Sequence, residues 1–83
     1  MNTKYIIIIT TYNPDESQKR ERPVWESTTK EYAEWVCAHH DMRRNFCAYA
    51  TDRMIAGSFS HDCAYIEEEG GRKVIMTITK KEG

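Results

Sequence analysis

The chain has 83 residues, with 12 basic and 13 acidic side chains and a formal net charge of −1. This length fits a single domain, residues 1–83, with a modest core. The near balance of charge argues against a general nucleic-acid binder, which carries a positive excess. It also argues against a decoy that imitates phosphates, which carries a large negative excess.

Cysteine usage and hydropathy predict the compartment. Three cysteines form no recognisable disulfide framework, so reduced thiols are the simplest interpretation. The apolar run near the N-terminus is too short for a signal peptide or a membrane span. We therefore expect a cytoplasmic protein with no membrane association and no cofactor.

The first predicted element is a strand over residues 4–12, KYIIIITTY, because its content of β-branched side chains is very high. A turn is expected at residues 13–15, where a proline pre-sets the backbone. The following stretch, ESQKRERP, is charged and predicts a solvated loop. The segment PVWES, residues 23–27, predicts a short edge strand, because its proline cannot donate a ladder hydrogen bond.

A helix is predicted next. Thr28 and Glu31 have the spacing of a capping box. The segment 29–40 then shows two stripes at helical spacing. One stripe is Ala33, Val36, Cys37 and His40, and the other is Tyr32, Trp35 and His39. We interpret Trp35 and Cys37 as core residues that pack on the sheet.

Residues 41–59 also show helical spacing, either as a continuation of the first helix or as a second helix that starts near Asp41. Gly57 is the expected stop. A strand over residues 45–51 is the alternative.

The C-terminal part, CAYIEEEGGRKVIMTITK, predicts a hairpin that turns at Gly70 and Gly71. A two-residue loop would place Val74 opposite Glu67. A three-residue loop over residues 69–71 places Val74 opposite Ile66, and Met76 opposite Ala64. The second register gathers apolar side chains on one face, so it is the preferred prediction.

The predicted fold class is α+β: a small antiparallel sheet of β-β-α-β-β plan, with one or two helices in a single layer. One helical layer covers one face of the sheet. Either Ile6 and Ile8 or Ile7 and Ile9 face away from it, and we assign the uncovered face to Ile7, Ile9 and Ile75. An apolar face of this kind invites a homodimer or a partner protein, unless residues 13–26 fold over it.

Several exposed groups are candidates for contact with a partner protein. Carboxylates at the hairpin tip favour an arginine-rich partner surface, and exposed aromatic rings serve as anchors. The predicted contact residues are Tyr12, Arg20, Arg22, Trp25, Tyr65, Glu67, Glu68 and Glu69.

Chemistry at cysteine and histidine is the alternative. The zinc-ligand types are Cys37, His39, His40, Asp41, Cys47, His61, Asp62 and Cys63, with local clusters at residues 39–41 and 61–63. The spacing of Cys37, Cys47, His61 and Cys63 matches no common zinc pattern, and whether these four meet is left open. A thiol nucleophile at Cys37 could take His39 or His40, with Asp41, as its base, but adjacent turns of one helix rarely aim both groups at one cleft, and no orienting third group or oxyanion site is indicated. We expect no metal and no enzyme activity. A Cys/His metal-stabilised domain that contacts nucleic acid is the alternative function, although direct nucleic-acid binding is not our expectation.

The whole chain resembles, in pattern, the small accessory proteins of phages and mobile elements, anti-CRISPR inhibitors of host defence among them. The resemblance lies in the KYIIIITTY start, the charged loop 13–22, the STTKEYAEW helix start and the EEEGGRK hairpin. It implies a protein that occludes a surface of a larger host protein complex without chemistry. No functional residue is carried over from it.

Overall fold

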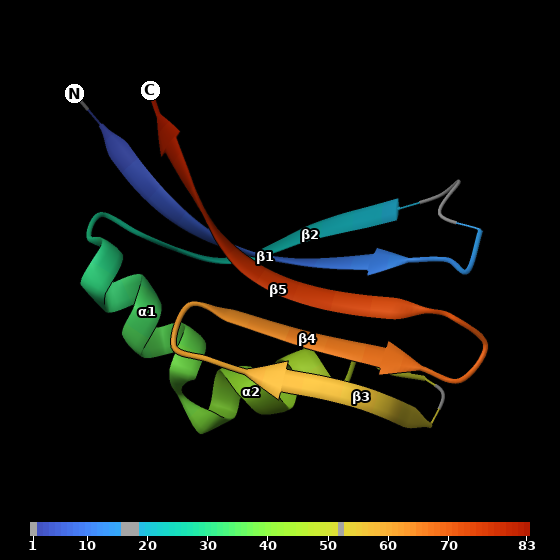
Figure 1. The fold of residues 1–83 in the computed structure, drawn as a ribbon. Coiled ribbons are helices and arrows are strands. Elements are labelled where there is room, and N and C mark those ends of the chain that lie inside the picture. Colours follow the sequence, from blue (N-terminus) through green and yellow to red (C-terminus); the bar gives the residue numbers. More distant parts are fainter. Residues whose placement is uncertain (1, 16–18, 52) are drawn as a thin grey trace.

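The computed structural model describes residues 2–15, 19–51 and 53–83. Over these residues the chain forms a five-stranded antiparallel sheet in the order β2-β1-β5-β4-β3, with two helices on one face (Figure 1). The predicted α+β class with one helical layer is confirmed. The elements are β1 Thr3–Tyr12, β2 Lys19–Ser27, α1 Lys30–Ala38, α2 His40–Cys47, β3 Met54–Phe59, β4 Cys63–Glu68 and β5 Lys73–Glu82.

The core lies between the helices and the central strands. β1 and β5 pair over their whole length, from Thr3 opposite Glu82 to Tyr12 opposite Lys73. Alternate residues of these strands face the helices, and they pack on the apolar stripes of α1 and α2. The buried hydrophobic residues are Ile7, Ile9, Ala33, Val36, Cys37, Met42, Phe46, Ala64, Ile66, Val74 and Met76.

The assignment of Ile7 and Ile9 to the uncovered face is therefore wrong. Their side chains are 0 % and 1 % exposed. Ile9 lies opposite Met76 on β5, and Met76 lies opposite Ala64 on β4, so Ile9 falls on the row that faces the helices. The other pair, Ile6 and Ile8, occupies the face that the helices leave open.

The C-terminal hairpin has the predicted register. Ile66 lies opposite Val74 and Ala64 opposite Met76. The connection turns through Gly70 and Gly71, whose φ angles are 91° and 92°. Backbone in this region is strained for residues with a side chain, which explains the two glycines.

Residues 54–59 differ from their predicted helix. They form strand β3, which pairs with β4 on its free side, and α2 already ends at Cys47. The alternative strand over residues 45–51 is also wrong. Pairing with β4 satisfies the backbone hydrogen-bonding groups of residues 54–59. The local spacing of apolar residues gives no information about this distant partner. At Gly57 the strands approach closely, because an added Cβ would lie 3.2 Å from the carbonyl oxygen of Tyr65.

Strand β2 is an edge strand, as predicted, but it is longer than PVWES. Residues 19–22 of the predicted loop pair with β1, and residues 16–18 lie outside the described residues. The pairing skips Val24, since Pro23 lies opposite Ile8 and Trp25 opposite Ile7. This bulge accommodates the proline within an edge strand.

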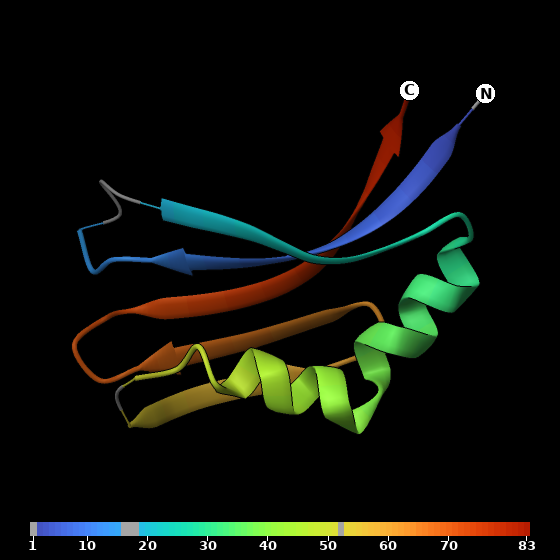
Figure 2. The same ribbon diagram turned by 180° about the vertical axis from the view of Figure 1, so that it is seen from behind.

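The helices begin and end at different residues from those predicted. Thr29, and not Thr28, caps α1, because its side-chain oxygen accepts a hydrogen bond from the Tyr32 amide at 3.3 Å. His39 has an extended backbone, with φ −69° and ψ 142°, and separates α1 from α2. Figure 2 shows α2 lying across β4 and β3, with α1 turned away from it at this junction. In the described part of the chain, neither helix is long and apolar enough to cross a membrane.

Candidate functional site

An exposed row of aromatic rings runs from β2 along α1 to the junction with α2. The ring centroids of Trp25 and Tyr32 are 6.5 Å apart. Tyr32 and Trp35 are stacked, with centroids 6.0 Å apart and planes 9° apart. The ring of His39 follows, 5.0 Å from that of Trp35. We call Trp25, Tyr32, Trp35 and His39 the aromatic row.

Helix geometry explains why these rings are exposed. Positions three and four apart share one stripe of a helix, and α1 carries an aromatic stripe beside its small apolar stripe. The stripe of smaller apolar side chains, Ala33, Val36 and Cys37, is buried against the sheet. The aromatic stripe therefore faces solvent, and the side chain of Trp35 is 60 % exposed. The interpretation of Trp35 as a core residue is wrong, and that of Cys37 is confirmed.

A groove of about 300 Å³ lies beside the aromatic row. Val36 and Met42, both buried hydrophobic residues, contribute apolar surface to it. Asp41 and Asn45 add polar groups at its rim. Apolar surface with a few polar groups, bordered by Trp and Tyr, is the composition found at the centres of protein interfaces. We call this hollow the aromatic groove.

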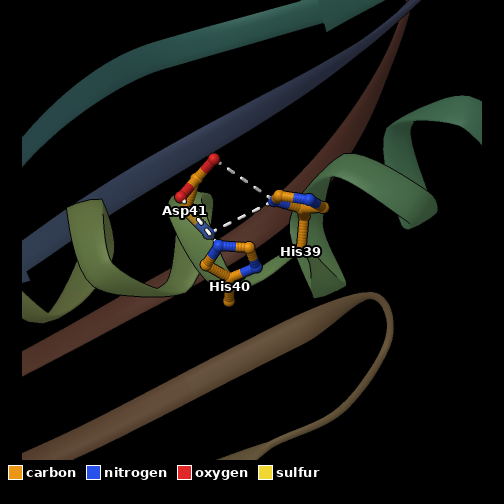
Figure 3. Close-up of polar contacts among 3 residues, drawn as sticks. All are labelled: His39, His40 and Asp41. Carbon is orange, nitrogen blue, oxygen red and sulfur yellow. Dashed lines mark hydrogen bonds and ion pairs between the residues drawn. The ribbon is translucent and has the colours of Figure 1, made fainter.

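The groove extends to His39 and Asp41, which lie together with His40 at the helix junction (Figure 3). The Nδ1 atom of His39 accepts a hydrogen bond from the Asp41 amide at 3.2 Å, so His39 caps α2. The Asp41 carboxylate lies 3.1 Å from Nε2 of His40 and 3.7 Å from Nδ1 of His39. His40 is exposed, and not part of the buried stripe of α1. This trio orients the last ring of the row.

The structure brings together parts of the predicted set of potential metal ligands, but not its cysteines. Among the described residues, the close groups are His39 with His40 and Asp41, and Glu34 with His61 and Asp62; neither contains a cysteine. The Nδ1 atom of His39 is already engaged as a cap, and His61 Nε2 is 3.0 Å from a Glu34 oxygen. Helix capping and ion pairing therefore account for both groups.

Cys37 does not have the properties of a nucleophile. Burial raises the pKa of its thiol to about 11, with a further contribution from nearby Cys63. A thiol with this pKa stays protonated at neutral pH, and the thiolate is the form that attacks or binds metal. Cys37 is buried, Cys63 is half-buried and Cys47 is exposed on α2, so the three cysteines have different environments.

The predicted basic contacts Arg20 and Arg22 are exposed on β2. Arg22 lies opposite Ile9 and Trp25 opposite Ile7, so both project from the helix-facing side of this strand. Together with Tyr49 and Arg72, the two arginines line a separate hollow of about 130 Å³. The basic side chains and the aromatic row thus share one side of β2.

The hairpin carboxylates have three different environments. Glu68 is 0 % exposed, and its Oε2 accepts a hydrogen bond from the Thr51 amide at 2.8 Å, while Oε1 pairs with Arg72. Its prediction as a partner contact is wrong, because it faces the core side of β4. Glu67 accepts a hydrogen bond from the Tyr65 hydroxyl at 2.7 Å, which raises the pKa of Tyr65. Glu69 pairs with Arg53 at 2.7 Å and remains accessible.

The remaining predicted contacts lie on the sheet face that the helices leave open. Tyr12 and Ile75 occupy this face with Ile6 and Ile8, and Tyr65 lies there opposite Ile75. These side chains are half-buried by their strand neighbours. The structure therefore divides the predicted contacts between two faces, with Trp25 and the arginines on the side opposite Tyr12 and Tyr65.

Comparison with protein-family models, with curated proteins and with solved structures finds no match for this chain.

Proposed function

We propose that this protein is a non-enzymatic protein-binding module and that its partner docks in the aromatic groove. The supporting observation is the aromatic row itself, in which Trp25, Tyr32 and Trp35 are 43 %, 48 % and 60 % exposed. Full burial of a large apolar side chain contributes roughly 1.5–3 kcal/mol, and a partner that covers the exposed part of these rings recovers a share of that energy. Stacking holds the rings in place before binding, and this lowers the entropic cost of association.

We further propose that the protein is a phage-type inhibitor that occludes a surface of a larger cytoplasmic complex of host defence, such as a CRISPR effector. The resemblance to small accessory proteins and the compact single domain support this class. An arginine of the partner fits the groove, because its guanidinium can stack on Trp35 and pair with Asp41. Inhibition by occlusion needs affinity and shape, and no reactive group.

The test is capture of partners from host lysate on the immobilised protein, read by mass spectrometry. The wild-type chain should retain a defined complex in high salt. Trp25→Ala and Trp35→Ala should each release it. The matched control is Tyr12→Ala, which removes a half-buried aromatic ring from the sheet face opposite the groove and away from β3. Equal capture by all four proteins would refute the groove as the docking site.

Single-stranded nucleic acid is the second candidate partner. The stacked Tyr32 and Trp35 rings and the unburied Arg20 and Arg22 on the same side of β2 favour it, because such tracks combine stacking with phosphate neutralisation. Binding to a labelled oligonucleotide that weakens steeply with salt, and is lost in an Arg20→Ala/Arg22→Ala variant, would favour this candidate. Salt-tolerant capture of a protein complex would favour the first. A metal-stabilised form has less support, since the thiol of Cys37 stays protonated.

A further inference from the structure

The two edges of the sheet are built differently. The β2 edge carries Lys19, Arg20, Glu21, Arg22 and Pro23 and contains a bulge. Charges, proline and bulges are the devices by which proteins keep an edge strand from pairing with another chain. The β2 edge is therefore protected.

The β3 edge lacks most of that protection. Its sequence, MIAGSF, contains no charge and no proline, and every residue of it is exposed. Met54, Ile55 and Phe59 are 54 %, 56 % and 41 % exposed. A bulge at Ile55 leaves residues 56–59 in regular register with β4. Within the described residues β3 pairs with β4 alone, so its outer backbone groups are open to another strand.

We propose that β3 pairs antiparallel with β3 of a second copy of this chain, which joins the two five-stranded sheets into one. A twofold axis places each patch against itself, so a self-pairing strand has to tolerate its own side chains. An uncharged strand meets this condition, whereas a strand with Lys or Glu places like charges opposite each other. Antiparallel pairing also brings the start of one strand, at Arg53, toward the end of the other, where Asp62 follows.

This dimer has a defined geometry. The twofold axis of antiparallel strands is perpendicular to the sheet, so the helices of both copies lie on the same face. Each aromatic groove is lined in part by Trp25 of β2. Strand β2 is at the opposite edge of the sheet from β3 (Figure 1). The dimer leaves both grooves accessible, and two grooves on one particle would add avidity toward a repetitive partner. The inference concerns a surface separate from the groove, and neither proposal depends on the other.

The test measures molar mass by sedimentation equilibrium from micromolar to near-millimolar protein. We expect the wild-type chain to dimerise. Ala56→Lys and Ala56→Glu should each raise the dissociation constant of the dimer about tenfold or more, because the same charge on each copy then lies near its counterpart at the middle of the paired strands. An equimolar mixture of the two variants should recover the dimer. Glu21→Lys on the β2 edge and Trp25→Ala in the groove are controls that should remain dimeric. Circular dichroism establishes that each variant is folded.

Three outcomes would overturn the inference. They are a wild-type chain that stays monomeric throughout, a dimer that persists unchanged in both Ala56 variants, or a mixture of them that stays monomeric. A dimer disrupted by Ile8→Glu on the open sheet face, but not by the Ala56 variants, would assign self-association to stacked sheet faces instead. Partner capture through Trp25 is measured independently, so failure of either proposal is distinguishable from failure of the other.

Discussion

Glu68 and Arg72 form an ion pair whose two members differ in their access to water. The Glu68 side chain is 0 % exposed, whereas that of Arg72 is 20 % exposed. Arg72→Met leaves a carboxylate charge buried without its cation, although the Thr51 amide still donates to it. Removing one partner of a buried pair in this way costs roughly 3–5 kcal/mol. Glu68→Gln keeps the shape and an acceptor oxygen, and it leaves a guanidinium that water can reach, so we expect a loss of about 1–2 kcal/mol.

Urea unfolding of the wild type, both single variants and the double variant measures these losses. A domain of this kind has a total stability of about 5–15 kcal/mol, so Arg72→Met should shift the unfolding midpoint strongly. The double variant should be more stable than Arg72→Met alone, because it removes the unpaired charge. These unequal losses require that water reaches Arg72 and not Glu68. An equal loss of unfolding free energy in the two single variants, or a larger loss in Glu68→Gln, would refute this.

Three further predictions concern the core, the buried thiol and the turn. Phe46→Ala removes a ring that is 0 % exposed, and should lower the free energy of unfolding by about 3–5 kcal/mol in urea; a loss below about 1 kcal/mol would contradict its central place in the core. The folded-state pKa of Cys37, about 11, exceeds its ordinary value of 9.0, so the unfolded chain loses this proton first and stability should fall as pH rises from about 9 to 11. Thermal melts across that range should show a shallower decline for Cys37→Ala, and identical declines would exclude the thiol as a cause. Gly71→Ala, at φ 92°, should destabilise the hairpin by about 1–2 kcal/mol in urea, and an unchanged midpoint would show that the turn adopts another conformation.

The local patterns of the sequence account for much of the fold. The isoleucine run predicts β1, and the requirement that apolar side chains share a face predicts the register of Ile66 with Val74. Prediction from local patterns fails where a contact distant in sequence determines the structure of a segment. β3 exists because β4 offers it a partner, and its own residues fit helical spacing equally well. The choice between Ile7 and Ile6 for the core depends on the register of β1 with β5, which no local pattern contains.

The candidate site was only partly accessible from the sequence. Trp25 was predicted as a contact because it follows a proline on an edge strand. Tyr32 and Trp35 were missed as contacts, although their signal was present: two stripes on a short helix cannot both face one sheet. Glu68 was misassigned because its neighbours Glu67 and Glu69 suggest a solvated turn. Strand alternation turns the middle carboxylate to the opposite face, where Arg72 accommodates it.

The pairing of β1 with β5 governs how a newly made chain can fold. The two strands with the longest pairing come from residues 3–12 and residues 73–82, so residues 13–72 must be synthesised before the isoleucine run meets its longest neighbour. Until then the run can pair only with β2, and a two-stranded ribbon is marginal in water. Formation of the sheet is therefore dominated by loop closure over long distances. Until β5 is made, the segment KYIIIITTY, which later forms the centre of the sheet, exposes apolar side chains and unpaired backbone groups that are prone to aggregation.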